Sequence, residues 1–131
     1  MKSILVVDDS TVIRQAITDS LQNEGFTVSE TCNGKDALAT AQKYYHDLIL
    51  TDMNMPVMDG LTLVRNLRKL PSYKETPILV LTAENLSELK VKGRAAGASG
   101  WIVKPFISNH HVPAICKCLE RHIFKLPHSL P

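Results

Sequence analysis

Short apolar runs alternate with longer segments of helical spacing five times along the chain. The apolar runs, bounded by turn residues, predict strands at residues 4–7, 26–31, 48–51, 78–81 and 101–103. Between and after them, apolar residues recur every three or four positions. This spacing predicts helices around residues 12–21, 37–41, 61–67, 86–96 and within 108–124.

Several residues mark where the predicted helices begin and end. Ser10 is a suitable N-cap for the first helix and Gly25 a stop, while Pro71 and Gly97 end the third and fourth helices. The second helix starts after residues 33–34. The apolar stripe predicted for the first helix consists of Val12, Ile13, Ala16, Ile17 and Leu21, and that of the fourth helix consists of Leu86, Leu89, Val91, Ala95 and Ala96.

Strand–helix alternation of this kind predicts an α/β protein with one parallel sheet covered by helices on both faces. No linker or low-complexity tract divides the chain. We therefore expect one domain at residues 1–124, followed by a frayed tail at 125–131.

Composition narrows the class of protein further. The 131 residues are 44% hydrophobic and 21% charged, as in a soluble globular domain. A net charge of +2 is too small to indicate nucleic-acid or membrane binding. No apolar stretch is long enough to span a membrane, and the N-terminus lacks a signal-peptide core. Three cysteines do not form a disulfide framework, so we expect a reducing, cytoplasmic setting.

Polar side chains stand at the carboxyl ends of the predicted strands. Asp8 and Asp9 follow the first strand, Asp52 the third, Thr82 the fourth and Lys104 the fifth. Open parallel α/β sheets bind ligands at this edge. Taken singly, the acidic pair reads as a helix cap, the lysine as a surface residue and the threonine as a strand former. Their joint placement at one edge of the sheet favours a ligand-binding site.

This set of residues suits phosphoryl chemistry. Three close carboxylates repel one another unless a cation is present, and Mg²⁺ prefers carboxylate and phosphate oxygens. Thr82 can hydrogen-bond a phosphate oxygen, and Lys104 can neutralise another. Asp52, alone on the middle strand, is the expected nucleophile, which would form an aspartyl-phosphate.

Four stretches in order, VVDDS, TDMNMPVMDG, VLTAEN and GASGWIVKPF, resemble the receiver domain of two-component response regulators. The resemblance is closest to the stand-alone, CheY-like chemotaxis type and runs from about residue 2 to 106. It implies a flavodoxin-like (βα)5 doubly wound sheet with strand order 2-1-3-4-5.

The resemblance also implies roles for the site residues. Asp52 would accept phosphate from a histidine kinase. Mg²⁺ would be held by Asp8, Asp9, Asp52 and the backbone carbonyl of Asn54. Thr82 would contact the phosphoryl oxygens.

Further roles follow from the same resemblance. Lys104 would contact the phosphoryl oxygens, and the Lys104–Pro105 peptide bond would be cis. Trp101 matches the aromatic switch position. Asn54 and Glu84 match the two positions that tune self-dephosphorylation.

The implied function is a phosphorylation switch that acts by binding a protein, with no turnover of an external substrate. No DNA-binding output domain is expected after residue 131, so the expected output is protein contact or competition for phosphate. The resemblance implies a chemotaxis target such as a flagellar motor switch, and a monomer is expected. A phosphate sink, a regulator outside chemotaxis and a degenerate binding module remain alternatives. An aspartyl-phosphate hydrolase of the haloacid dehalogenase type needs an aspartate where Asn54 stands.

After Phe106 the resemblance fades. This segment contains a set of metal-ligand residue types, namely His110, His111, Cys116, Cys118 and His122. The two cysteines would face different sides of a helix, and Cys118 with His122 supplies only two ligands, which argues against zinc. An amphipathic last helix is predicted instead, with Pro113 in its first turn. Its apolar side consists of Val112, Ile115, Cys116, Leu119 and Ile123.

Overall fold

Five parallel strands form one sheet in the order β2-β1-β3-β4-β5, as predicted. The computed structural model describes the backbone at residues 2–83 and 87–129, and the side chains there except at 87–90, 93 and 121–129. The strands are β1 (Ser3–Val7), β2 (Thr27–Thr31), β3 (Leu48–Asp52), β4 (Ile78–Thr82) and β5 (Gly100–Val103). Each lies within one or two residues of its prediction.

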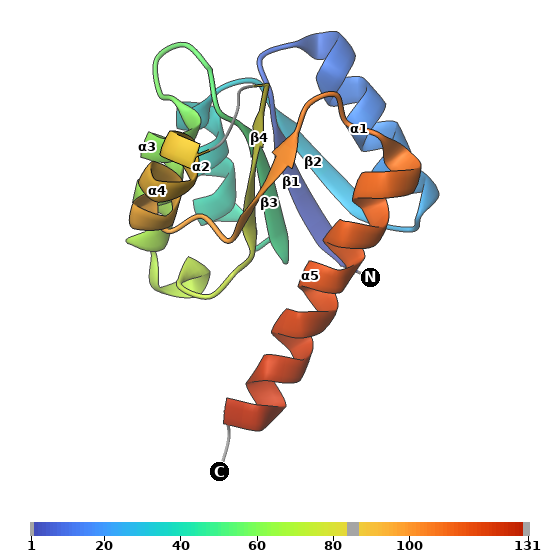
Figure 1. The fold of residues 1–131 in the computed structure, drawn as a ribbon, viewed down its shortest axis with the longest axis vertical. Coiled ribbons are helices and arrows are strands. Elements are labelled where there is room, and N and C mark those ends of the chain that lie inside the picture. The colour runs from blue at the N-terminus through green and yellow to red at the C-terminus, as the bar shows by residue number, and fades with distance from the viewer. Residues whose placement is uncertain (1, 84–86, 130–131) are drawn as a thin grey trace.

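Helices cover both faces of the sheet, which confirms the predicted doubly wound α/β class (Figure 1). The helices are α1 (Thr11–Asn23), α2 (Gly34–Lys43), α3 (Gly60–Arg68), α4 (Ser87–Ala96) and α5 (Ser108–Ser129), with a short 3₁₀ helix, η1 (Pro71–Tyr73). In Figure 1, α1 and α5 lie on one side of the sheet, and α2, α3 and α4 lie on the other.

The sheet separates two apolar clusters. Successive side chains of a strand point to opposite faces. In β4, Ile78 and Val80 therefore enter the cluster beneath α2, α3 and α4, whereas Leu79 and Leu81 enter the cluster beneath α1 and α5. We call these the α2–α4 cluster and the α1–α5 cluster. Because all five strands run parallel, their carboxyl ends lie together at one edge of the sheet.

Side-chain caps fix the helices that begin at this edge. Ser10, Asn33 and Asp59 each accept a backbone N–H from the first turn of α1, α2 and α3, respectively. Gly25 and Gly97 have positive φ angles just after α1 and α4. The predicted cap at Ser10 and the predicted stops at Gly25 and Gly97 are therefore confirmed, and α2 begins one residue earlier than predicted, at Gly34.

The predicted apolar faces of α1 and α4 were only partly right. Val12 is 80% exposed, and Ala16 is also exposed. The residues of α1 that are buried are Ile17, Thr18 and Leu21. On α4, Val91 is exposed, although the sequence placed it on the apolar side. An apolar residue next to a buried stripe need not be buried, because a helix packed on a sheet covers a narrow strip of its surface.

The last helix extends to Ser129, beyond the predicted start of a frayed tail at 125. Pro113 is the sixth residue of α5 rather than part of its first turn. The carbonyl that loses its N–H partner there belongs to exposed Asn109, where water can replace it.

The predicted apolar side of α5 is confirmed at Val112, Ile115 and Leu119, which are buried, and at Cys116, which is partly buried. The side chains of His122 and Ile123 lie outside the described residues. None of the helices in the described part of the chain combines the length and apolar character that crossing a membrane requires.

Candidate phosphoryl-acceptor site

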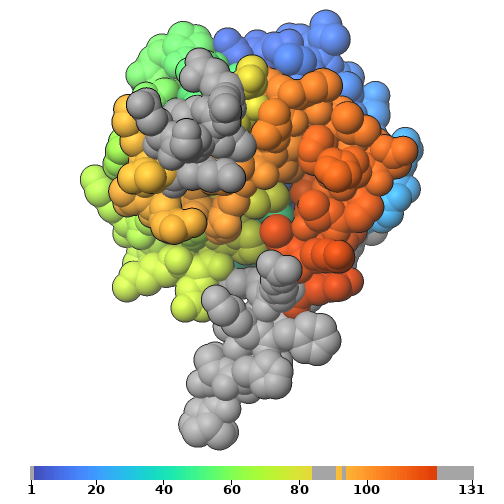
Figure 2. All heavy atoms as spheres, in the orientation of Figure 1, coloured from blue at the N-terminus to red at the C-terminus, as the bar shows by residue number. Residues whose placement is uncertain are grey.

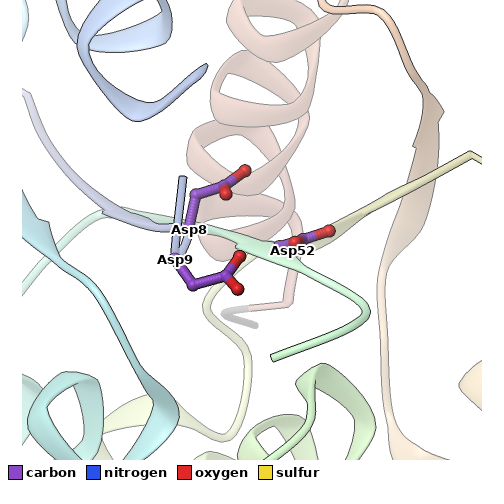
Figure 3. Close-up of side chains that lie close together, drawn as sticks. All are labelled: Asp8, Asp9 and Asp52. Carbon is purple, nitrogen blue, oxygen red and sulfur yellow. The ribbon is translucent and has the colours of Figure 1, made fainter. Parts of the chain in front are cut away.

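Three carboxylates meet where β1 and β3 end. Val7 pairs with Thr51 across the two strands, so Asp8 and Asp52 emerge side by side. With Asp9, they offer oxygen atoms that all lie within 4.8 Å of one another. Figure 3 shows the carboxyl groups of Asp8 and Asp9 extending from the end of β1 toward Asp52.

Burial makes this cluster electrostatically costly. Asp8 and Asp52 are buried, whereas Asp9 is exposed. Burial raises the pKa of Asp8, and the negative charges of Asp52 and Asp9 act in the same direction. One oxygen, Oδ1, accepts the Ser10 N–H at 2.9 Å. The other, Oδ2, is buried with no hydrogen-bond partner among the described residues.

Among the described residues, one ammonium group forms an ion pair with this cluster, that of Lys104. Its Nζ lies 2.9 Å from Oδ1 of Asp52. Its backbone N–H donates to the Thr82 carbonyl at 2.8 Å, which fixes the residue beside the end of β4. The Lys104–Pro105 peptide bond is cis, as the resemblance implied.

Thr82 and Trp101 lie on the same face of the sheet, on the neighbouring strands β4 and β5. Val80 pairs with Trp101, and Thr82 pairs with Val103, so all four side chains point to the α2–α4 side. Thr82 is buried, and Trp101 is partly buried against the α2–α4 cluster. Thr82 and the indole of Trp101 therefore lie along the same face of the sheet.

The loop from β3 to α3 is held close to Asp52 by a glycine. A Cβ atom on Gly60 would lie 2.3 Å from the backbone oxygen of Asp52, which no side chain can tolerate. The Gly60 N–H also donates to the Met53 carbonyl at 2.9 Å. Asn54 is exposed in this loop. Glu84, the other predicted tuning residue, lies outside the described residues.

Sequence reasoning missed Arg14 of α1. Its Nη1 donates to the Asp8 carbonyl at 2.7 Å, and its Nε pairs with Glu30 of β2 at 3.1 Å. Arg14, on α1, thereby helps to hold the backbone at Asp8 in place. The sequence offered only a weak signal, a basic residue six positions after Asp8, where it is unfavourable for the helix dipole.

The donor set fits a hard divalent cation. Three carboxylates and one ammonium leave two formal negative charges, and an unpartnered buried carboxylate oxygen faces the cluster. Mg²⁺ binds through one or two carboxylates with water or phosphate oxygens completing its shell. The chemistry of the residues present therefore fits Mg²⁺.

Comparison with known proteins agrees with this geometry. The family described as "Response regulator receiver domain" matches residues 4–115. The chain therefore belongs to the response regulator receiver family, whose members are signalling domains of two-component systems that bind Mg²⁺ at an acidic pocket.

Among curated relatives, the chain is 36% identical over 119 residues to the "Probable transcriptional regulator ycf29" of Porphyra purpurea. The match covers 91% of this chain and 57% of that protein, so the chain spans about half the length of several relatives it resembles. It is also 36% identical to "Chemotaxis protein CheY-3" of Vibrio cholerae, covering 90% of this chain and 92% of that one.

Solved structures share the fold closely. A structure of the chemotaxis protein CheY4 of Vibrio cholerae has 44% identity and a TM-score of 0.88, covering 90% of this chain and 98% of that one. The receiver domain of the sensor histidine kinase PA1611 of Pseudomonas aeruginosa has 28% identity and a TM-score of 0.84 over 91% of this chain and 98% of that one. That structure has a magnesium ion coordinated in its active-site cleft.

Proposed function

We propose that this receiver takes a phosphoryl group from the phosphohistidine of a histidine kinase onto Asp52 and thereby changes its binding to a partner protein. The observation that carries the proposal is the setting of Asp52. This buried carboxylate ends a central strand, is paired with Lys104 and stands beside two further aspartates.

In the proposed transfer, a carboxylate oxygen of Asp52 attacks phosphorus. The new O–P bond forms as the P–N bond to the kinase histidine breaks, and the imidazole leaves as the neutral ring after protonation. Lys104 neutralises charge on a phosphoryl oxygen, and Thr82 donates a hydrogen bond to another. Asp8, Asp9, Asp52 and the carbonyl of Asn54 would hold Mg²⁺, which would further neutralise negative charge.

The proposed switch starts from the added charge. Phosphorylation brings about 1.5–2 negative charges to a site that already holds three carboxylates. Thr82 would turn toward the phosphoryl oxygens, and Trp101 would fill the space on the same face. The outcome is a shift between two populated conformations. In this scheme Asn54 and Glu84 set the lifetime of the phosphorylated state.

Chemotaxis is the pathway we propose, with a protein of the flagellar motor switch as target. Similarity to CheY-3 and CheY4 over nearly their whole lengths supports this proposal. The longer transcriptional regulators among the relatives favour a second candidate, a receiver that controls another domain. A monomer in the cytoplasm remains the prediction from the sequence.

Trp101 fluorescence provides the test, because it is the only tryptophan of the chain. We would add Mg²⁺ and then beryllofluoride or acetyl phosphate to the wild type, to Asp52→Asn and to Asp36→Asn. Asp36 is an exposed aspartate of α2 outside the cluster. A saturable, Mg²⁺-dependent change in the wild type and in Asp36→Asn, absent in Asp52→Asn, is expected.

Intact mass after acetyl phosphate completes this test. One phosphate adduct that disappears in Asp52→Asn is expected. A wild type that takes up no phosphate would contradict the proposal. Steady turnover of a generic phosphomonoester would instead indicate a hydrolase.

A further inference from the structure

The first turn of α5 has an unusual cap. The residue before the helix is Ile107, which is exposed and has no side-chain acceptor for the free N–H groups of the first turn. Ser, Thr, Asp and Asn are the usual residues at this position, because their oxygen atoms accept such an N–H. This helix start therefore needs a different partner.

His111 stabilises this helix start through the N–H of Ile107 itself. Its Nδ1 accepts the Ile107 backbone N–H at 2.8 Å, and its backbone N–H donates to the Ile107 carbonyl at 2.7 Å, as in any helical turn. This reciprocal pair resembles a capping box, in which a side chain in the first turn returns to the N–H of the capping residue. The imidazole also packs on the Phe106 ring, with centroids 5.4 Å apart.

The segment held by His111 is the one that carries Lys104. Phe106 packs against the α1–α5 cluster, and only Pro105 separates it from Lys104. Lys104 is then fixed at its other end by Thr82 and Asp52. The loop from β5 to α5 is thus tied at both ends, once at the acidic site and once by His111. Figure 2 shows the segment, in orange, on the surface, where protons from solvent have access.

We propose that neutral His111 is a positioning residue for Lys104 and makes phosphoryl uptake on Asp52 sensitive to pH. This inference rests on the proposed function. Nδ1 can accept the Ile107 N–H only when it carries no proton, so the proton of the neutral ring is on Nε2. Protonation turns Nδ1 into a donor that faces another donor. It also places a positive charge at the N-terminus of a helix, which the helix dipole opposes.

The surroundings of His111 favour the neutral form. Burial lowers the pKa of His111, and the neighbouring imidazole of His110 lowers it further. Glu24, from the end of α1, acts on the Cys116 thiol rather than on this ring. The ammonium of Lys104, from the loop, is engaged with Asp52. The cap is therefore fully formed above the ordinary histidine pKa and is lost as the pH falls through the lowered value.

The test compares rates of phosphate uptake from acetyl phosphate, at saturating Mg²⁺, between about pH 5 and 8. His111→Gln keeps a side-chain acceptor that does not titrate in this range. His110→Gln removes the exposed neighbour and leaves the cap. Loss of a helix cap typically shifts a local equilibrium by about fivefold. On acidification, we expect the wild-type rate to fall about fivefold more than the rate of His111→Gln. In His110→Gln, the same fall in rate is expected at a slightly higher pH than in the wild type.

A second readout follows the bond itself. The Ile107 amide and the His111 ring nitrogens, observed by ¹⁵N nuclear magnetic resonance, should titrate together in the wild type, with the proton of the neutral ring on Nε2. Identical pH–rate profiles of wild type and His111→Gln would overturn the proposal, as would an Ile107 amide that does not respond to titration. A wild type that takes up no phosphate at any pH would overturn the proposed function and this role with it, even if the amide still titrates.

Discussion

Val57 is the residue with the least favourable backbone among those the structure describes. It is the one non-glycine residue there with a positive φ, 71°, and its side chain is 89% exposed. A β-branched side chain crowds the backbone in this left-handed region, at a cost of roughly 1–2 kcal/mol. Since the side chain gains little by packing, this strain is not offset locally.

Val57→Asn is expected to stabilise the protein by about 1 kcal/mol, because asparagine tolerates the left-handed conformation. Urea unfolding measures the change. Val12→Asn is the matched control, since Val12 is 80% exposed but lies in the first turn of α1. A gain of equal size in both variants would show that backbone strain at Val57 is not its source.

The site itself was largely predictable at the level of single residues. Asp8, Asp52 and Lys104 follow buried strands, and the rule that parallel strands end at one edge brought them together. Arg14 and His111 were not predicted, because their roles depend on hydrogen bonds to backbone groups of other segments. Such bonds leave no pattern in the sequence. The structure brings Asp8, Asp52 and Lys104 together, and the functional roles of all the site residues, Asn54 and Glu84 included, remain predictions.

Among the elements, α3 is joined to two distant segments by one side chain. Arg68 donates to the carbonyls of Tyr73, Thr76 and Gly97 at 2.6, 2.7 and 2.9 Å. Its Nη2 also donates to the Ser99 hydroxyl at 3.1 Å. The guanidinium therefore connects the end of α3 with the segment before β4 and with the turn before β5.

Arg68→Ala is expected to lower the free energy of unfolding by about 2–3 kcal/mol, because it leaves several carbonyls without a donor. Arg65→Ala, at an exposed position of the same helix, controls for the loss of a charge and should change stability by much less. Denaturant unfolding of both variants measures the difference. Equal losses would mean that Arg68 contributes only helix propensity.

Element positions were predicted better than element faces. The alternation of apolar runs and turn residues located every strand, since a strand buried on both faces is apolar throughout. The exposed faces of α1 and α4 were misjudged because Val12 and Val91 have the right spacing yet lie beyond the strip that the sheet covers. Which side of an apolar stripe is buried depends on how the helix lies on the sheet.

At the scale of the whole molecule, one buried histidine links stability to pH. His46 is 2% exposed, its Nε2 lies 3.0 Å from the Ser29 hydroxyl, and its Nδ1 has no partner among the described residues. Burial lowers the pKa of His46, while the Tyr44 carbonyl and Asp47 act in the opposite direction. Below the ordinary histidine pKa the unfolded chain therefore binds more protons than the folded one.

The wild type is expected to lose stability as the pH falls from about 7 to 5, and His46→Gln should lose less. Each unit by which the folded pKa lies below the unfolded one is worth about 1.4 kcal/mol. The glutamine amide can keep a hydrogen bond to Ser29. Urea unfolding across this pH range measures the slope, with His110→Gln as an exposed control. Parallel curves for the wild type and His46→Gln would rule out this source of acid sensitivity.

The sheet separates the interior into two clusters that are packed independently of each other. The α1–α5 and α2–α4 clusters have no residue in common, since each strand sends alternate side chains to opposite sides. Substitutions far apart and without shared neighbours combine almost additively. Most replacements beneath α1 and α5 are thus expected to leave the packing around Trp101 unchanged. One sheet in this way supports two interiors that contribute to stability almost independently.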